Sequence, residues 1–398
     1  MLILEYKLDG KPTQYAAMDE GIRVVQFLRN KCLRAWMDRA EEGQSASAMS
    51  ASTAVLAKQF PFAAALGSQA RQAAAQRAWQ AVQRFYDTCK QQQPGKKGYP
   101  RFQRTNRSIE YKVAGWKLAP DGKHITFTDG LGIGRLRLVG TRSIETFPLA
   151  QIKRVRLVRR ADGYYCQFCV DAQRTLIHVP TGKHVGIDLG LLSFYTDSEG
   201  NVAENPRHYR KAEKKLGTLN QRVHRKPKGS KNRGKARKRL GKQHLKVARQ
   251  REDHARKLAC ALVSSHDLIA YEDLQVRTMV KNHHLSKSIS DAGWSLFLQW
   301  VRYYALLHGV ECIAVPPAYT SQTCSGCGEL VRKSLSVRTH CCPHCGLILD
   351  RDQNAALNIL QEAYRILGHR KTGESAFGDS RERLGTEAPL AGDHMASR

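Results

Sequence analysis

Hydrophobic spacing divides the first 180 residues into a helical part and a strand-rich part. From residue 15 to 92 apolar residues recur with helical spacing. The glycines and prolines of 94–102 end this pattern, and strand-like alternation follows from about 100 to 178. Asp162-Gly163 lies between two alternating runs and predicts a β-hairpin there.

A different order of elements follows. Short apolar segments at 184–190, 265–274 and 310–315 predict buried strands, and a predicted hairpin directly follows the first of them. Two basic helices come next, then an amphipathic helix at 291–309 and a closing helix at 352–367. Three early strands, then helix, strand, helix, strand and helix, is the order of an RNase H-like α/β sheet.

Charge narrows the possible functions. The 398 residues carry a formal net charge of +30, and residues 207–257 hold 21 Lys and Arg against three acids, or +18 of that total. A charge run is often only a solvated helix face, but so many like charges repel one another. A bound polyanion would offset that repulsion. No stretch has the ~20 apolar residues of a membrane span, and the first residues lack a secretory signal. We therefore expect a nucleic-acid-binding protein with no membrane partner; a location in the prokaryotic cytoplasm, with association to the nucleoid when on target, is what the family resemblance described below implies.

Five of the eleven cysteines fall between 324 and 345. Two Cys-x-x-Cys pairs, 14 residues apart, match the spacing of a structural zinc ribbon with one Zn²⁺. Cys341 and His344 are spare donors, and ordinary reduced cysteines are the alternative. A third pair, Cys166 and Cys169, sits on a predicted strand and would face opposite ways. The expected zinc ligands are Cys324, Cys327, Cys342 and Cys345.

Three acids stand where carboxylates are costly unless they are paired or bound to metal. Asp188 and Glu272 lie in apolar strands, and Asp352 opens the closing helix. In an RNase H-like sheet these positions meet at one edge, where they would hold two Mg²⁺ ions, or Mn²⁺ in their place, for in-line phosphodiester hydrolysis. Each acid also has a plain interpretation as a turn, strand-end or N-cap residue, and Asp350 is the alternative third ligand.

The chain resembles the TnpB family of transposon-encoded RNA-guided nucleases, relatives of type V CRISPR effectors. The resemblance rests on VGIDLG, AYEDL, SISDAGW, TSQTCSGCG, CCPHCG and DRDQNAALNI in that order, with YPRF further upstream. It implies a RuvC-type catalytic triad of Asp188, Glu272 and Asp352, and it places Arg338 near the scissile phosphate. It also implies a guide RNA and double-stranded target DNA as partners, with a short flanking motif read by the protein.

The expected fold is a multidomain α+β protein: an N-terminal helical recognition domain, a β-rich wedge domain, and an RNase H-like (RuvC) α/β nuclease domain with an inserted zinc ribbon. The expected boundaries are 1–14 and 95–180 for the wedge domain, 15–94 for the recognition domain, 181–319 and 348–367 for the nuclease domain, 320–347 for the zinc-ribbon insert that binds the target nucleic acid, and 368–398 for an unstructured tail.

The basic segment is expected to contact nucleic acid. The residues assigned to this role are Arg222, Arg225, Lys226, Lys228, Lys231, Arg233, Lys235, Arg237, Lys238 and Arg239. Two other functions fit parts of the pattern. One is an RNA-guided DNA binder without cleavage, similar to a repressor, which the intact triad disfavours. The other is a transposase, because an acidic triad can also support strand transfer.

Overall fold

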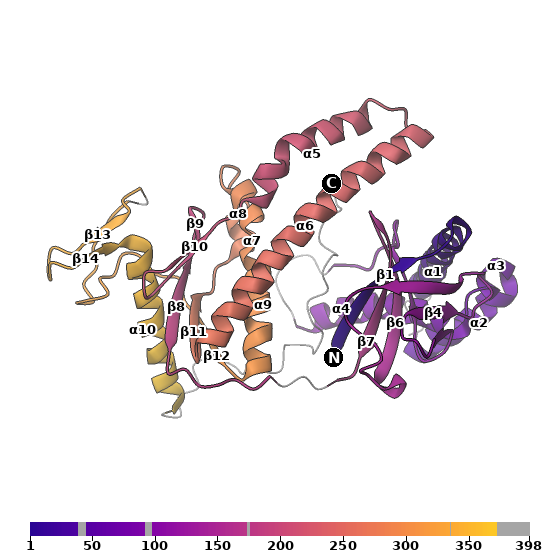
Figure 1. Ribbon diagram of the computed structural model, residues 1–398, viewed down its shortest axis with the longest axis horizontal. Helices are drawn as coiled ribbons and strands as arrows, with labels where there is room; N and C mark the ends of the chain where they lie inside the picture. Colours follow the sequence, from indigo (N-terminus) through magenta and orange to yellow (C-terminus); the bar gives the residue numbers. More distant parts are fainter. Residues whose placement is uncertain (39–44, 92–97, 173–175, 335, 372–398) are drawn as a thin grey trace. The chain divides into compact units, whose positions relative to one another are not determined.

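The structure, a computed structural model, describes residues 1–38, 45–91, 98–172, 176–334 and 336–371. The chain forms two compact units, Met1–Gln173 and Arg174–Arg398 (Figure 1). None of the described helices is both long and apolar enough to cross a membrane.

The first unit contains a seven-stranded sheet in the order β2-β6-β7-β1-β5-β4-β3. All its pairings are antiparallel, and β1, at the start of the chain, lies between β7 and β5. The strands are β1 (Leu2–Asp9), β2 (Ser108–Tyr111), β3 (Trp116–Leu118), β4 (His124–Phe127), β5 (Gly134–Val139), β6 (Ile152–Arg160) and β7 (Gly163–Val170), with a 3-10 turn η1 (Leu149–Gln151) before β6.

The predicted hairpin is confirmed, with its turn one residue earlier than expected. Arg160 pairs with Gly163, so Ala161 and Asp162 form the loop. Gly163 has a φ of 147°, a conformation that suits glycine. Cys166 and Cys169 are buried strand residues of the sheet that this hairpin joins.

Helices fill the predicted helical part of this unit. They are α1 (Pro12–Asp38), α2 (Ala46–Gln59), α3 (Pro61–Ala64) and α4 (Ser68–Lys90). The buried face of α1 packs with α4 and the sheet in one core that includes Leu28 and Ala74, and Trp36 and Val82 belong to a second cluster. Residues 39–44 and 92–97, which the prediction of helix from 15 to 92 partly includes, lie outside the described residues.

The second unit contains a five-stranded sheet in the order β10-β9-β8-β11-β12. Its strands are β8 (His184–Leu189), β9 (Ser193–Asp197), β10 (Val202–Glu204), β11 (Leu268–Glu272) and β12 (Glu311–Val315). The strands β8, β11 and β12 are parallel neighbours, and β9 and β10 complete an antiparallel meander. The expectation that the strand of Asp188 adjoins the strand of Glu272 is thus confirmed.

Helices cover both faces of this sheet. The described helices of this unit, not all of which reach the sheet, are α5 (His208–His224), α6 (Lys231–Ser265), α7 (Val276–Met279), α8 (Ser286–Ala292), α9 (Trp294–His308) and α10 (Arg351–Lys371). On one face α6 and α9 pack on the strands, and on the other face α10 packs on them (Figure 1). The strand β11 is buried throughout because its alternate side chains enter both cores.

Gly186 permits the close approach of α10 to β8. A Cβ atom at this position would lie 2.1 Å from the carbonyl oxygen of Ala356 and 3.0 Å from the Leu360 side chain. A backbone carbonyl cannot move aside as a flexible side chain can. Any larger residue would therefore push α10, with its acidic first turn, away from the sheet edge that carries Asp188.

Two expected boundaries differ from the structure. A small hairpin of β13 (Thr339–Cys341) and β14 (Ile348–Asp350) extends the cysteine-rich insert to Asp350, because the two strands pair along their whole length. The closing helix α10 continues to Lys371, so 368–371 belong to it and not to the tail. The rest of the expected tail, 372–398, lies outside the described residues.

Candidate active site

Strand register brings Asp188 and Glu272 together. Ile187 pairs with Tyr271 across the parallel strands β8 and β11, and each acid is the next residue on its strand. Because side chains alternate along a strand, Asp188 shares a face with Gly186, and Glu272 shares one with Ala270. Both Gly186 and Ala270 face α10. The two carboxylates therefore leave neighbouring strands at the same level, on the side of the sheet that α10 covers.

The electrostatics of this edge favour a cation. Burial, then the neighbouring carboxylates of Glu272 and Asp352, raise the pKa of Asp188 well above its usual range, against the opposing charge of Arg351. Burial also raises the pKa of Glu272. Within the described part of the chain no group donates a hydrogen bond to the Asp188 carboxylate. Oxygen ligands of like charge at a partly buried edge suit a hard divalent ion such as Mg²⁺, so these residues fit the expected metal.

The two aspartates at the start of α10 have different roles. Oδ1 of Asp350 accepts hydrogen bonds from the backbone amides of Asp352 (2.8 Å) and Gln353 (3.2 Å), so Asp350 is the N-cap. The Asp352 carboxylate instead contacts Arg338 (3.3 Å) and Arg351 (2.8 Å). The interpretation of Asp352 as only an N-cap is therefore wrong, because Asp350 already caps the helix.

Arg338 lies beside the acids, as one partner of Asp352. Its side chain is 49% exposed, whereas the Arg351 side chain is only 14% exposed. The segment that carries Arg338 is tied to α10 by a hydrogen bond of 2.7 Å from the Arg351 amide to the Arg338 carbonyl. A half-exposed arginine at this place has the reach and the charge to contact a phosphate.

The four predicted zinc ligands come together. Sulfur atoms of Cys324 and Cys345 lie 3.6 Å apart, as do those of Cys327 and Cys342, and the four all lie within 4.8 Å of one another. Tetrahedral zinc with Zn–S bonds of ~2.3 Å places its sulfurs about 3.8 Å apart, so the cluster fits one zinc ion. The spare donors Cys341 and His344 are exposed and outside this group.

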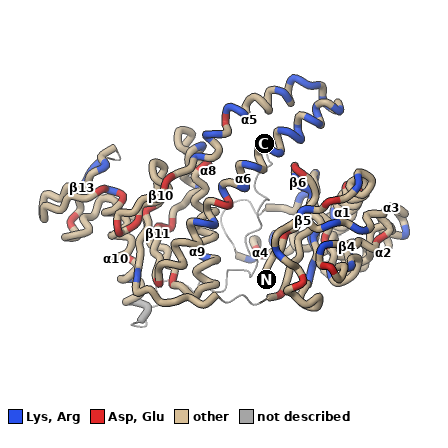
Figure 2. Tube along the Cα trace, viewed as in Figure 1, with Lys and Arg blue, Asp and Glu red and all other residues tan. Residues whose placement is uncertain are grey.

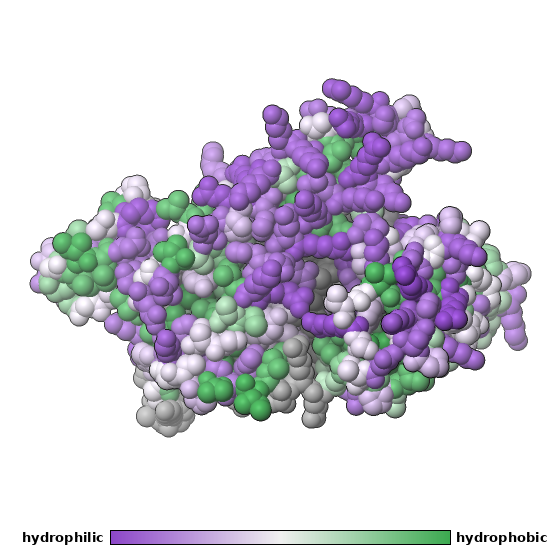
Figure 3. Space-filling model, viewed as in Figure 1, coloured by the Kyte–Doolittle hydropathy of each residue, from purple (hydrophilic) through white to green (hydrophobic). Residues whose placement is uncertain are grey.

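The basic segment forms a helical hairpin of α5 and α6, referred to here as the basic hairpin (residues 208–265). From Lys214 to Arg251 the sequence has 16 lysines and arginines and no acid. Figure 2 shows these charges along both helices, and Figure 3 shows a hydrophilic surface over them. Eight of the ten predicted contact residues are exposed and have no ion-pair partner among the described residues: Arg222, Arg225, Lys228, Lys231, Lys235, Arg237, Lys238 and Arg239.

Of the other two predicted contacts, Arg233 uses its side chain in the turn between the helices, and Lys226 contributes its backbone carbonyl. Arg233 donates a hydrogen bond of 2.7 Å to the carbonyl of Lys226, and both residues are half-buried. This bond closes the turn between the helices, where Ser230 also caps α6 by accepting from the Arg233 amide at 3.1 Å. The Arg233 guanidinium is therefore partly committed to the turn and is a weaker choice for a phosphate contact.

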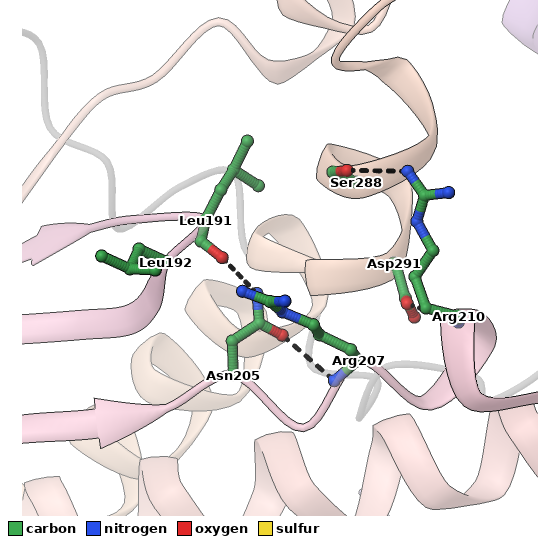
Figure 4. Close-up of a pocket in the computed structure, with 7 residues that line it drawn as sticks. All are labelled: Leu191, Leu192, Asn205, Arg207, Arg210, Ser288 and Asp291. Carbon is green, nitrogen blue, oxygen red and sulfur yellow. Dashed lines mark hydrogen bonds between the residues drawn. The ribbon is translucent and has the colours of Figure 1, made fainter. Parts of the chain in front are cut away.

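A pocket of about 480 Å³ marks the base of the basic hairpin (Figure 4). Asp291 in this pocket accepts from the backbone amides of Tyr209 (2.8 Å) and Arg210 (2.9 Å), and Arg251 pairs with it at 3.0 Å. One buried carboxylate thus joins α5, α6 and α8. Asp291 belongs to the SISDAGW motif, but the sequence predicted no role for it, and nothing in its spacing indicates this distant N-cap.

Two family models match the second unit and the few residues that precede it. Residues 167–283 match the family OrfB_IS605, described as "Probable transposase", and residues 294–359 match "Cas12f1-like, TNB domain". A "Putative RNA-guided DNA endonuclease InsQ" from Escherichia coli is 30% identical over 287 residues, 68% of this chain and 69% of that protein. The chain belongs to the TnpB family.

Other relatives and solved structures share less of their length or sequence. A "Putative RNA-guided DNA endonuclease" from Streptomyces pristinaespiralis is 38% identical over 182 residues, and the match spans 45% of each chain. The chain thus matches under half the length of that relative. The match to the solved "Cas12f1-sgRNA-target DNA complex" covers 91% of this chain and 99% of that chain at 14% identity, with a TM-score of 0.35.

Proposed function

We propose that this protein is an RNA-guided DNA endonuclease that cuts target DNA beside a short flanking motif by two-metal phosphodiester hydrolysis. The observation that carries the proposal is the acidic edge formed by Asp188, Glu272 and Asp352, which come from two adjacent strands and a helix packed on them. The names of its TnpB relatives support a nuclease. The basic hairpin supports a polyanionic partner.

The proposed mechanism assigns a role to each residue of the edge. Asp188, Glu272 and Asp352 would hold Mg²⁺, or Mn²⁺ in its place, which when bound supplies an activated water and stabilises the leaving 3′ oxygen. Gly186 keeps α10 close enough for Asp352 to share the edge with Asp188. Arg338 approaches from the solvent side, and we assign it to the phosphate beside the cut.

The basic hairpin would hold the guide RNA and its pairing with the target. The eight exposed predicted contact residues lack ion-pair partners among the described residues, so phosphate contacts would offset their mutual repulsion. Asp291 of α8 ties this hairpin, through Arg251, to the rest of the unit that carries the acidic edge. Recognition of sequence would then come from base pairing, and the protein would read only the flanking motif.

The decisive experiment starts from the RNA that co-purifies with the protein. Sequencing that RNA defines a target, which is placed in a plasmid beside a randomised flanking region. Cleavage in Mg²⁺ of the matched plasmid, none of a scrambled target, and none by Asp188→Ala is the expected result. Binding of the matched DNA without cleavage would identify the repressor-like alternative, and joined strands would identify the strand-transfer alternative.

A further inference from the structure

Glu272 has a hydrogen-bond partner that the assigned site residues do not include. The hydroxyl of Thr320 donates to Oε1 of Glu272, and both residues are buried. Thr320 follows β12 at the start of the cysteine-rich insert, 48 positions beyond Glu272. A hydrogen bond to one carboxylate oxygen fixes the direction in which the other oxygen points. Hydrogen-bond partners of metal ligands commonly orient the ligands in this way.

The backbone around Thr320 is held in an uncommon conformation. Tyr319 has a φ of 62°, in the left-handed region that bulky residues rarely adopt. Its carbonyl accepts hydrogen bonds from the amides of Gln322 and Thr323, both at 2.9 Å, so the segment turns sharply at this point. Such conformations persist where the surroundings determine them strongly, and they concentrate at functional sites.

Two asparagines on the inner face of α10 hold this segment by hydrogen bonds to its backbone. Nδ2 of Asn358 donates to the carbonyls of Thr320 and Thr323, each at 2.7 Å. Asn354 is fully buried, and it donates to the Thr323 carbonyl at 2.8 Å and accepts from the Ser325 amide at 3.0 Å. Cys324 lies between these anchored residues, so the segment that presents Thr320 also carries the first zinc ligand.

We propose that Thr320 is a positioning residue for Glu272, and that Asn354 and Asn358 hold Thr320 in place. This rests on the proposed function only for the identity of Glu272 as a metal ligand. The helix that supplies Asp352 would then also fix the orientation of Glu272, through the entry of the zinc-ribbon insert. Glu272 and Asp352 would keep a constant distance and orientation to each other, even though they lie 80 positions apart in the sequence.

The test measures Mn²⁺ binding to the full chain with its co-purified RNA, by the decrease of the free Mn²⁺ electron paramagnetic resonance signal, without any cleavage. Thr320→Val removes the hydroxyl at nearly constant shape and should weaken Mn²⁺ binding about tenfold, the lower end of the usual cost of removing an outer partner. Thr320→Ser keeps the hydroxyl and should stay within about twofold of the wild type. Ser321→Ala is the matched control, since it removes a neighbouring hydroxyl that has no partner among the described residues, and it should bind as the wild type does.

Three further measurements separate positioning from mere structure. Zinc content should remain one per chain in every variant, and cleavage at saturating Mn²⁺ should recover in Thr320→Val to within a few-fold. Asn358→Ala should weaken Mn²⁺ binding as well, and the double variant should lose little more than Thr320→Val alone, because both act through one hydrogen bond. Thr320→Ala replaces Thr320→Val should the latter not fold.

Unchanged Mn²⁺ binding in Thr320→Val overturns the proposal, as does an equal loss in Thr320→Ser. A wild-type complex that binds Mn²⁺ but cuts no DNA would instead refute the proposed function and leave the role of Thr320 standing. The two failures are therefore distinguishable.

Discussion

The second unit of this chain contains two candidate metal sites that differ in how completely the protein assembles them. The four thiolates stand within 4.8 Å of one another, ready for one tetrahedral ion. The three carboxylates instead share an edge at which Asp188 has a raised pKa and Asp352 forms ion pairs with two arginines. A closed set of ligands suits a structural ion, whereas an open set leaves positions for water and substrate. We therefore propose that the thiolate site serves stability and the carboxylate site serves chemistry.

The largest expected effect tests the open site. Asp188→Asn keeps the shape of the side chain and removes its charge, so it should slow cleavage at least about 1,000-fold, which is about 4 kcal/mol of barrier. Binding of the matched DNA should change little, because it draws on the basic surface. Single-turnover cleavage and filter binding on one preparation measure both. Cleavage near the wild-type rate would remove Asp188 from the triad.

The next prediction tests the closed site. Cys324→Ser with Cys345→Ser should abolish the single tightly held zinc, which elemental analysis of fresh protein measures. Cleavage should fall about 10- to 100-fold, the usual range when residues that support a metal site are disturbed, because the insert carries Arg338 and Thr320. Brief EDTA treatment of the wild type should stop cleavage reversibly while the zinc stays bound. Fresh protein without zinc, or full cleavage by the double variant, would contradict this interpretation of the insert.

The basic hairpin should act on binding and not on chemistry. Replacing Arg222, Arg225, Lys238 and Arg239 with glutamine should weaken RNA binding and flatten its salt dependence, by about 0.7 to 0.9 in log–log slope for each phosphate that is no longer neutralised. Lys257→Gln is the control, since Lys257 already pairs with Asp253 at 2.7 Å. An unchanged slope in the quadruple variant would show that these residues are only a solvated surface.

A smaller effect concerns the stability of the metal-free protein. The pKa of Asp188 is raised in the folded state, so folding favours its neutral form, and stability is lost as pH rises from the unfolded value of ~3.9 through the folded one. Asp188→Asn removes this loss. In EDTA the variant should melt at a higher temperature than the wild type at pH 7.5, with the difference vanishing near pH 4. Calorimetry at both pH values measures it, and equal melting temperatures at pH 7.5 would count against the raised pKa.

The sequence predicted the elements that depend on local spacing and left out those that depend on distant contacts. The order of strands predicted that Asp188 and Glu272 lie on neighbouring strands, and the cysteine spacing predicted a cluster of four thiolates; the structure has both. Nothing local indicated that Asp291 caps α5 from another helix. A signal did exist for Asn354 and Asn358, because two amides four positions apart on the apolar face of a helix need partners when buried.

The smallest expected effect separates the two aspartates at the start of α10, whose order in sequence left the third ligand open. Asp350 accepts two backbone hydrogen bonds as the N-cap, and asparagine can accept them equally well. Asp350→Asn should therefore leave both cleavage and stability nearly unchanged, and Asp350→Ala should cost about 1 kcal/mol of stability with cleavage retained. Asp352→Asn is the matched comparison: it also removes one charge from the same helical turn, yet it should stop cleavage as Asp188→Asn does. Rates and unfolding free energies of the three variants decide between the residues. If Asp350→Asn were the inactive variant and Asp352→Asn the active one, Asp350 would be the third ligand and the contacts of Asp352 with Arg338 and Arg351 would be purely structural.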